Sequence, residues 1–238
     1  MSKKLDKKRA RREAELRKQQ EMKRQARRRN LTTSLVAVVV IVLVVALVIV
    51  QRGNQQTSKD LASVDYKKLP SGLPGIMTGS PPWPANNESD LAPRLNQLGF
   101  PARSMESLDF HIHSHLDIFV HGKSVPVPGN IGIDSGGKFL TVLHTHSPDG
   151  IIHIESPIQT DYGLGQFLDV WGLKLTKTCI GGLCSDGQNS LTAYANGKKV
   201  ADPRYIQLKS HEEIVLAYGT KDEIPNPIPK SFDFPAGD

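Results

Sequence analysis

Two patterns of apolar and polar positions divide the chain, and the first is an uncharged apolar run over Leu31–Val50. The run holds twenty residues, nine of them valine. A helix of this length spans about 30 Å at 1.5 Å per residue, which is the hydrocarbon thickness of a bilayer. A buried core helix is the alternative, but soluble domains of this size rarely contain a helix that is apolar on all sides. The run therefore predicts a transmembrane helix.

The second pattern is an alternation over residues 109–121, which read DFHIHSHLDIFVH. The even-numbered positions are nearly all apolar, whereas the odd-numbered positions are polar and rich in histidine. Successive side chains of a strand point to opposite faces, so this alternation is typical of a half-buried strand. We expect one face in the core and His111, His113 and His115 side by side on the other.

A hairpin is expected next, because the run that ends at Leu143 is followed by HTHSPDGIIHIE. Proline presets the backbone for a turn and glycine closes it, so Ser147–Gly150 predicts a tight turn. The returning strand then carries His153 and Glu155 on one face and two isoleucines on the other.

Two registers are open for this hairpin. A two-residue loop at Pro148–Asp149 places His144 opposite His153, whereas a bulge at Gly150 places Thr145 there. One residue of slip moves every side chain to the other face. The histidine spacing favours the first register, because the second would leave two imidazoles among isoleucines at a cost of about 1–3 kcal/mol each.

The remaining periodicities predict one helix and further strands. Apolar residues recur at helical spacing from Leu164 to Trp171, with Gly172 as a stop. Strands are expected at 124–127, 191–195 and 213–218, with turns at 121–123 and 196–197. A helix on one face of a mixed sheet is the α+β class. The element order resembles a β-grasp with the 140–155 hairpin as an insertion, and a β-sandwich is the alternative.

These elements suggest five parts: a basic tail at residues 1–30, the transmembrane helix at 31–50, a proline-rich tether at 51–104, the histidine-rich α+β domain at 105–220, and a C-terminal extension at 221–238. The tether has room for one short helix, capped at Ser89 or Asp90 and stopped by Gly99. Its leucines are expected to dock on the domain.

Charge is concentrated in the tail. Its fourteen Lys and Arg and four Asp and Glu give +10, while the whole chain carries +6, so residues 31–238 sum to −4. A basic run can bind nucleic acid, but beside a transmembrane helix it is better explained by the positive-inside rule. We expect a retained signal anchor in the cell membrane, a cytoplasmic tail near anionic lipids, an extracytoplasmic domain and no nucleic-acid partner. Protein partners are not indicated.

The chain has two cysteines, Cys179 and Cys184. In an oxidising compartment such a pair usually forms a disulfide, which here would close a glycine-rich loop. The four-residue spacing also fits a metal or redox pair, although thioredoxin-type chemistry prefers two intervening residues.

The histidines carry the candidate chemistry, since seven of the eight lie between residues 111 and 153. Neutral imidazole is the commonest metal ligand, and an imidazole set assisted by carboxylates suits zinc or copper. The candidate ligands are His111, His113, His115, His144, His146 and His153. Structural histidines, or a proton-linked role without a metal, are the alternatives.

Two function classes follow from a metal site. The first is a membrane-anchored module that binds zinc or copper outside the cytoplasm. The second is a metal-dependent hydrolase that uses a metal-bound water, with Glu155 or Asp117 as acid or base, further ligand or orienting partner. A structural envelope module with non-ligand histidines is a third possibility. The sequence does not decide whether the protein is an enzyme.

The segments HIHSHLDIFVHGK, LHTHSPDGIIHIESP and LGQFLDVWG resemble an uncharacterised group of bacterial and archaeal membrane-anchored extracytoplasmic proteins with a histidine-rich domain. The resemblance covers roughly residues 92–218. It implies that this region forms one unit, and it implies no particular chemistry.

The charge asymmetry around residues 31–50 generates a first prediction. Protease added to intact cells should digest the C-terminal domain and leave a fragment that contains the tail and the anchor. Immunoblotting with antibodies against each end of the chain measures this. A domain that is protected until the cells are lysed would mean that the orientation is reversed.

Overall fold

The computed structural model describes residues 2–85 and 88–237, without the side chains of residues 1–14, 26, 28–35, 37 and 88. The chain divides into two compact units, Met1–Gln56 and Thr57–Asp238. Each unit is described by itself below.

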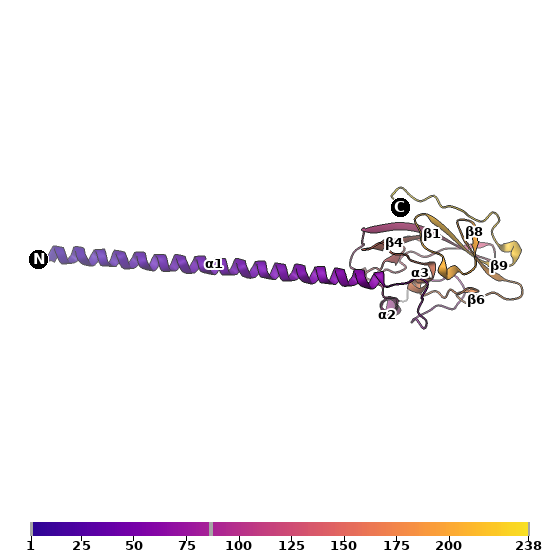
Figure 1. The fold of residues 1–238 in the computed structure, drawn as a ribbon, viewed down its shortest axis with the longest axis horizontal. Coiled ribbons are helices and arrows are strands. Elements are labelled where there is room, and N and C mark those ends of the chain that lie inside the picture. Colours follow the sequence, from indigo (N-terminus) through magenta and orange to yellow (C-terminus); the bar gives the residue numbers. More distant parts are fainter. Residues whose placement is uncertain (1, 86–87, 238) are drawn as a thin grey trace. The chain divides into compact units, whose positions relative to one another are not determined.

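The first unit lies within one continuous helix, α1 (Ser2–Ala62), which continues into the second unit (Figure 1). The helix contains the expected apolar run, and its stretch at Val38–Ala62 is long and apolar enough, by length and composition, to cross a membrane. The described apolar side chains between Val38 and Val50 are all exposed. The helix extends beyond the predicted run because its flanks are rich in Lys, Arg, Gln and Glu, which are good helix formers.

The second unit is built on a mixed sheet of seven strands in the order β3-β4-β1-β9-β7-β8, with β2 also paired to β1. The strands are β1 (Phe110–Val120), β2 (Lys123–Val125), β3 (Leu143–His144), β4 (Ile151–Ser156), β7 (Ser190–Ala195), β8 (Lys198–Val200) and β9 (Glu212–Gly219). Strands β1 and β9 are parallel, and the other pairs are antiparallel. The α+β prediction is confirmed.

The order β4-β1-β9-β7 is β-grasp-like, and the expected hairpin insertion extends the sheet. Strand β4 pairs with the first half of β1, from Phe110 to His115, while β2 pairs with the end of β1, from Ile118 to Val120. Both lie along the same edge of β1, because its other edge is occupied by β9.

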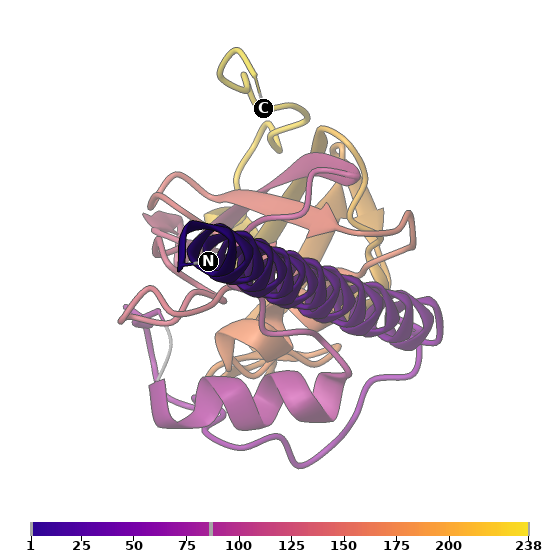
Figure 2. The ribbon, with the colours of Figure 1, turned by 90° about the vertical axis from the view of Figure 1, so that its left-hand side faces the viewer.

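Two helices pack on one side of this sheet. Helix α3 (Leu164–Trp171) is buried along its whole length and ends at Gly172, whose left-handed φ of 77° is the usual glycine helix stop. Helix α2 (Glu88–Leu98) packs against α3. Figures 1 and 2 both show α3 and α2 below the sheet and the C-terminal segment on its other side. Both predicted helices are confirmed.

The apolar face of the sheet packs toward these helices. Even-numbered residues of β1, β4 and β9, such as Leu116, Ile152 and Leu216, join α3 in one core cluster. The odd-numbered face of β1, which carries the histidines, is therefore turned away from α2 and α3.

The segment before β1, expected as a tether, also contributes to the core. Its buried members are Leu61, Leu73, Trp83, Leu91, Leu95, Leu98 and Phe100. The leucines of α2 dock on the domain as predicted. The indole of Trp83 meets that of Trp171 edge-on at 6.4 Å, and Trp171 donates to the carbonyl of Pro84 at 2.7 Å. Regular structure in this segment is limited to the end of α1 and to α2, which includes Pro93, and the irregular chain between them also buries side chains in the core.

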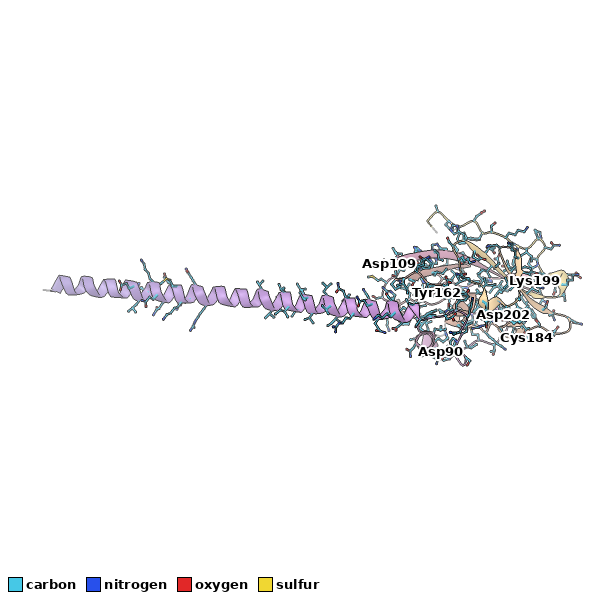
Figure 3. The ribbon with its side chains drawn as sticks, in the orientation of Figure 1. Asp90, Asp109, Tyr162, Cys184, Lys199 and Asp202 are labelled. Atoms are coloured by element: carbon cyan, nitrogen blue, oxygen red, sulfur yellow. A yellow bond between two sulfur atoms is a disulfide. The ribbon has the colours of Figure 1, made fainter. Side chains whose placement is uncertain are left out.

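The two cysteines form a disulfide, as predicted. It joins two short strands, β5 (Cys179–Ile180) and β6 (Leu183–Cys184), across the Gly181–Gly182 turn. Figure 3 shows Cys184 at the end of the domain remote from Asp109, the residue just before β1. The disulfide therefore links the two strands of a peripheral hairpin, which lies away from the start of β1.

A buried ion pair fixes α3 and yields a second prediction. Arg204 donates to both carboxylate oxygens of Asp169, at 2.7 and 3.2 Å, and to the carbonyl of Leu175 at 2.8 Å. The Arg204→Ala substitution leaves the buried carboxylate without this partner and should lower the free energy of unfolding by about 3 kcal/mol. Urea denaturation of the detergent-solubilised chain measures the loss.

Two variants control that measurement. The substitution of exposed Lys199 by alanine should change the free energy of unfolding by less than about 0.5 kcal/mol. Asp169→Asn combined with Arg204→Ala should recover part of the loss, because a neutral amide is less costly to bury than a carboxylate. An Arg204→Ala loss no greater than that of the lysine variant would contradict the structural role.

Candidate metal centre

Three neighbouring strands carry histidines in one row. Strand β4 lies between β3 and β1, and His153 of β4 pairs directly with His113 of β1 and with His144 of β3. This confirms the predicted register. At the turn itself, Gly150 has a φ of 84° and the Asp149 carboxylate accepts from the amide of Ile151 at 3.0 Å.

A first set of donors forms a closed ring on β1 and β4. The Nε2 atoms of His111 and His113 are 3.0 Å apart, and Nε2 of His113 is 3.0 Å from Nδ1 of His153. Glu155 closes the ring, with its Oε1 3.3 Å from His111 Nε2 and 3.4 Å from His153 Nδ1. Three imidazoles and one carboxylate thus converge.

A second set lies on the other side of β4. The Nε2 atoms of His144 and His146 are 3.2 Å apart, and His144 Nε2 is 3.8 Å from Oε1 of Glu155. The ring of His146 meets that of His153 edge-on at 4.5 Å. The two sets share His153 and Glu155, and the donor atoms within each set lie within 4.8 Å of one another.

Glu155 is the centre of both sets. It is only 3 % exposed, and among the described residues its Oε2 has no hydrogen-bond partner. Burial alone would raise the pKa of this carboxyl. The hydrogen bond from His153 and the Coulombic interactions with His144 and His111 outweigh that effect and hold the pKa below its usual range. The cluster therefore favours the carboxylate form, which is the form that binds metals.

His144 is held in one tautomer. Its Nδ1 is 2.9 Å from the carbonyl oxygen of Thr141, which can only accept, so Nδ1 carries the hydrogen and Nε2 is left with a lone pair. The side chain is fully buried, and this burial lowers the pKa of His144 to about 4. The imidazole is thus neutral at physiological pH, with its lone pair directed at the cluster.

The outer members of the two sets face solvent. The side chains of His111 and His146 are 32 % and 43 % exposed, whereas His113 is buried. Glu106 reaches the same edge, with its Oε1 3.4 Å from His146 Nε2. Sequence reasoning missed Glu106, because it precedes β1 and no periodicity relates it to the histidines.

His115 lies on the same strand face but belongs to another network. Its Nδ1 is 2.8 Å from Oε2 of Glu213 on β9, and its Nε2 is 2.9 Å from the carbonyl of Asp149. The ring stacks on Phe232 of the C-terminal segment at 3.7 Å. Both nitrogens thus face acceptors, and His115 lies outside the two sets centred on Glu155.

The electrostatics of this second network suit an ion pair. Burial would lower the pKa of His115, but the hydrogen bond and charge of Glu213 raise it above its ordinary value. Burial raises the pKa of Glu213. Asp117, a candidate acid or base from the sequence, groups with these two residues, whereas Glu155, the other candidate, lies at the centre of the histidine cluster.

The two other histidines lie in separate surroundings. His121, at the end of β1, contacts Glu223 at 3.0 Å and is exposed. His211 stacks on Phe234 at 4.5 Å. Five of the six predicted ligands therefore converge around Glu155, and these two histidines provide matched controls.

The spacing of the donors matches the spacing of ligands around a metal ion. Two imidazole nitrogens bound at about 2.0–2.1 Å in tetrahedral geometry are about 3.3 Å apart. Neighbouring donors around the first ring are separated by 3.0 to 3.4 Å, and all four donors lie within 4.8 Å of one another. This arrangement could hold a metal ion.

Comparison of the chain with protein-family models, with curated proteins and with solved structures found no match.

The separation of His115 from the cluster generates a third prediction. The His115→Ala substitution leaves the Glu213 carboxylate buried without its imidazole partner, so it should lower the free energy of unfolding by about 3 kcal/mol. The His146→Ala substitution removes an exposed side chain and should lower it by less than about 1 kcal/mol. Urea denaturation of chelator-treated protein measures both. Equal losses would contradict the assignment of His115 to a buried ion pair.

Proposed function

We propose that this protein is a single-pass membrane protein whose extracytoplasmic domain binds a divalent transition metal ion, zinc or copper. The supporting observation is the closed ring of three imidazole nitrogens and one buried carboxylate, with separations of 3.0 to 3.4 Å. The ligands in this proposal are His111, His113, His153 and Glu155.

The donor set favours these metals over others. Imidazole suits zinc and copper, whereas magnesium and calcium prefer sites made of oxygen ligands. Among the residues that the structure describes, Oε2 of Glu155 has no hydrogen-bond partner, and this also fits an ion, because a buried carboxylate oxygen without a partner is costly and a metal bond would satisfy it. The exposed edge of His111 leaves a path for the ion from solvent.

The proposed location combines three features of the chain. The apolar part of α1 is suited to a bilayer, and the basic tail before it is expected on the cytoplasmic side, near anionic headgroups. The disulfide in the domain is typical of an oxidising compartment outside the cytoplasm. Together these features support the proposal that the metal site lies at the outer surface of the cell membrane.

Metal binding by the purified chain is the fourth prediction. The full chain, purified in detergent without a histidine tag, should bind zinc or copper in equilibrium dialysis followed by elemental analysis. The His153→Ala and Glu155→Gln substitutions each remove a central ligand and should weaken binding more than about 100-fold. Loss of an outer-shell partner alone costs 10- to 100-fold.

The controls use histidines outside the cluster. The His121→Ala and His211→Ala variants should bind as the wild type does, and His115→Ala should retain binding if its fold is intact by circular dichroism. Absence of bound metal in the wild type, or equal binding by the His153→Ala variant, would overturn the proposal.

A further inference from the structure

We propose that the cluster holds two metal ions, with Glu155 between them, and that His144 and His146 bind the second. This inference rests on the proposed function, which assigns an ion to the ring of His111, His113 and His153. It adds a second site on the β3 side of the same carboxylate.

The number of donors is the first argument. Five imidazoles and one carboxylate converge, whereas zinc is almost always four-coordinate in protein sites. One ion in the first ring already has four protein donors. His144 and His146 would then be left as two further imidazoles with no coordination role, although their Nε2 atoms are 3.2 Å apart and directed at each other.

The sheet order is the second argument. Each outer strand of the β3-β4-β1 group presents a His-x-His pair on one face, His111 and His113 on β1 and His144 and His146 at β3. The two outer strands are two strand spacings apart, about 9.6 Å. Strand β4 lies between them and carries the shared His153 and Glu155. The arrangement thus places one His-x-His pair on either side of a central strand that carries a histidine and a carboxylate common to both sets.

The position of the carboxylate is the third argument. Oε1 of Glu155 lies 3.3 Å from His111 Nε2 on one side and 3.8 Å from His144 Nε2 on the other. Its Oε2 is buried and has no hydrogen-bond partner among the described residues. A carboxylate can give an oxygen to each of two ions, and ions in shared sites lie about 3.5–4 Å apart. A bridging role would use both oxygens of Glu155.

The charge balance indicates what else the pair of ions would take. Two divalent ions carry four positive charges, while the imidazoles are neutral ligands and Glu155 supplies one negative charge. Glu106, 3.4 Å from His146, is the next carboxylate at this edge. Anionic oxygen ligands such as hydroxide or phosphate would therefore complete the coordination on the exposed side, beside His111 and His146.

Stoichiometry tests this proposal. The full chain, without a histidine tag, is dialysed against buffered free zinc, and its bound zinc is counted by elemental analysis. Two ions per wild-type chain are expected, and one per chain in each of the variants His111→Ala/His113→Ala and His144→Ala/His146→Ala. The matched control His121→Ala/His211→Ala should keep both ions.

Single substitutions at the exposed edge serve where a double variant fails to fold. His146→Ala should lower the affinity for the second ion by at least tenfold and leave the affinity for the first ion unchanged. His111→Ala should lower the affinity for the first ion and leave that for the second unchanged. Copper(II) adds an independent readout. At two equivalents the spins should couple and give a half-field signal in electron paramagnetic resonance, which Glu155→Gln should abolish.

The outcomes separate the two proposals. One ion per wild-type chain, lost in His111→Ala/His113→Ala and kept in His144→Ala/His146→Ala, would overturn the second site and leave the proposed function standing. If the wild-type chain binds one ion and both double variants lose it, the histidines form a single shared site. This result would also overturn the proposal of two ions. No bound ion in the wild type would overturn the proposed function itself.

Discussion

The register of the β3-β4-β1 pairing is the constraint on which the candidate site depends. His113, His153 and His144 share one row because His153 of β4 pairs directly with His113 of β1 and with His144 of β3. A slip of one residue would send the β3 histidines to the opposite face. Glycine is favoured at position 150 for two reasons. Its φ of 84° suits the turn, and a Cβ there would come within 2.8 Å of the His115 ring nitrogen.

A site built on strands in this way is largely preorganised. Strand pairing fixes the backbone of His111, His113, His144 and His153, and the carbonyl of Thr141 fixes the tautomer of His144. Glu155 is buried before any ion binds, so its desolvation is a cost of folding rather than of binding. The apolar face of the same strands packs on the α3 side, and this packing offsets such costs through the burial of hydrocarbon.

The same alternation that creates the site also gives the sheet one apolar face and one polar face. Even positions of β1 form the core, and odd positions form the polar face. The C-terminal segment covers part of that polar face, where Phe232 stacks on His115. The uncovered part is the edge that holds His111, His146 and Glu106. An ion at this edge would be accessible from solvent while its inner ligands stay dry, which strengthens charge interactions within the cluster.

The sequence by itself determined the features that depend on neighbouring residues. Alternation predicted β1 and its two faces, turn chemistry and histidine spacing predicted the register of β3 with β4, and helical periodicity with Gly172 predicted α3. The pairing of Cys179 with Cys184 followed from their proximity in the chain.

Tertiary structure decided the contacts between distant segments. The parallel pairing of β1 with β9 brings Glu213 to His115 across 98 positions, Phe232 covers that ring, and Glu106 reaches His146. No local pattern encodes these contacts, because they depend on which strand edges and surfaces meet once the whole chain is packed.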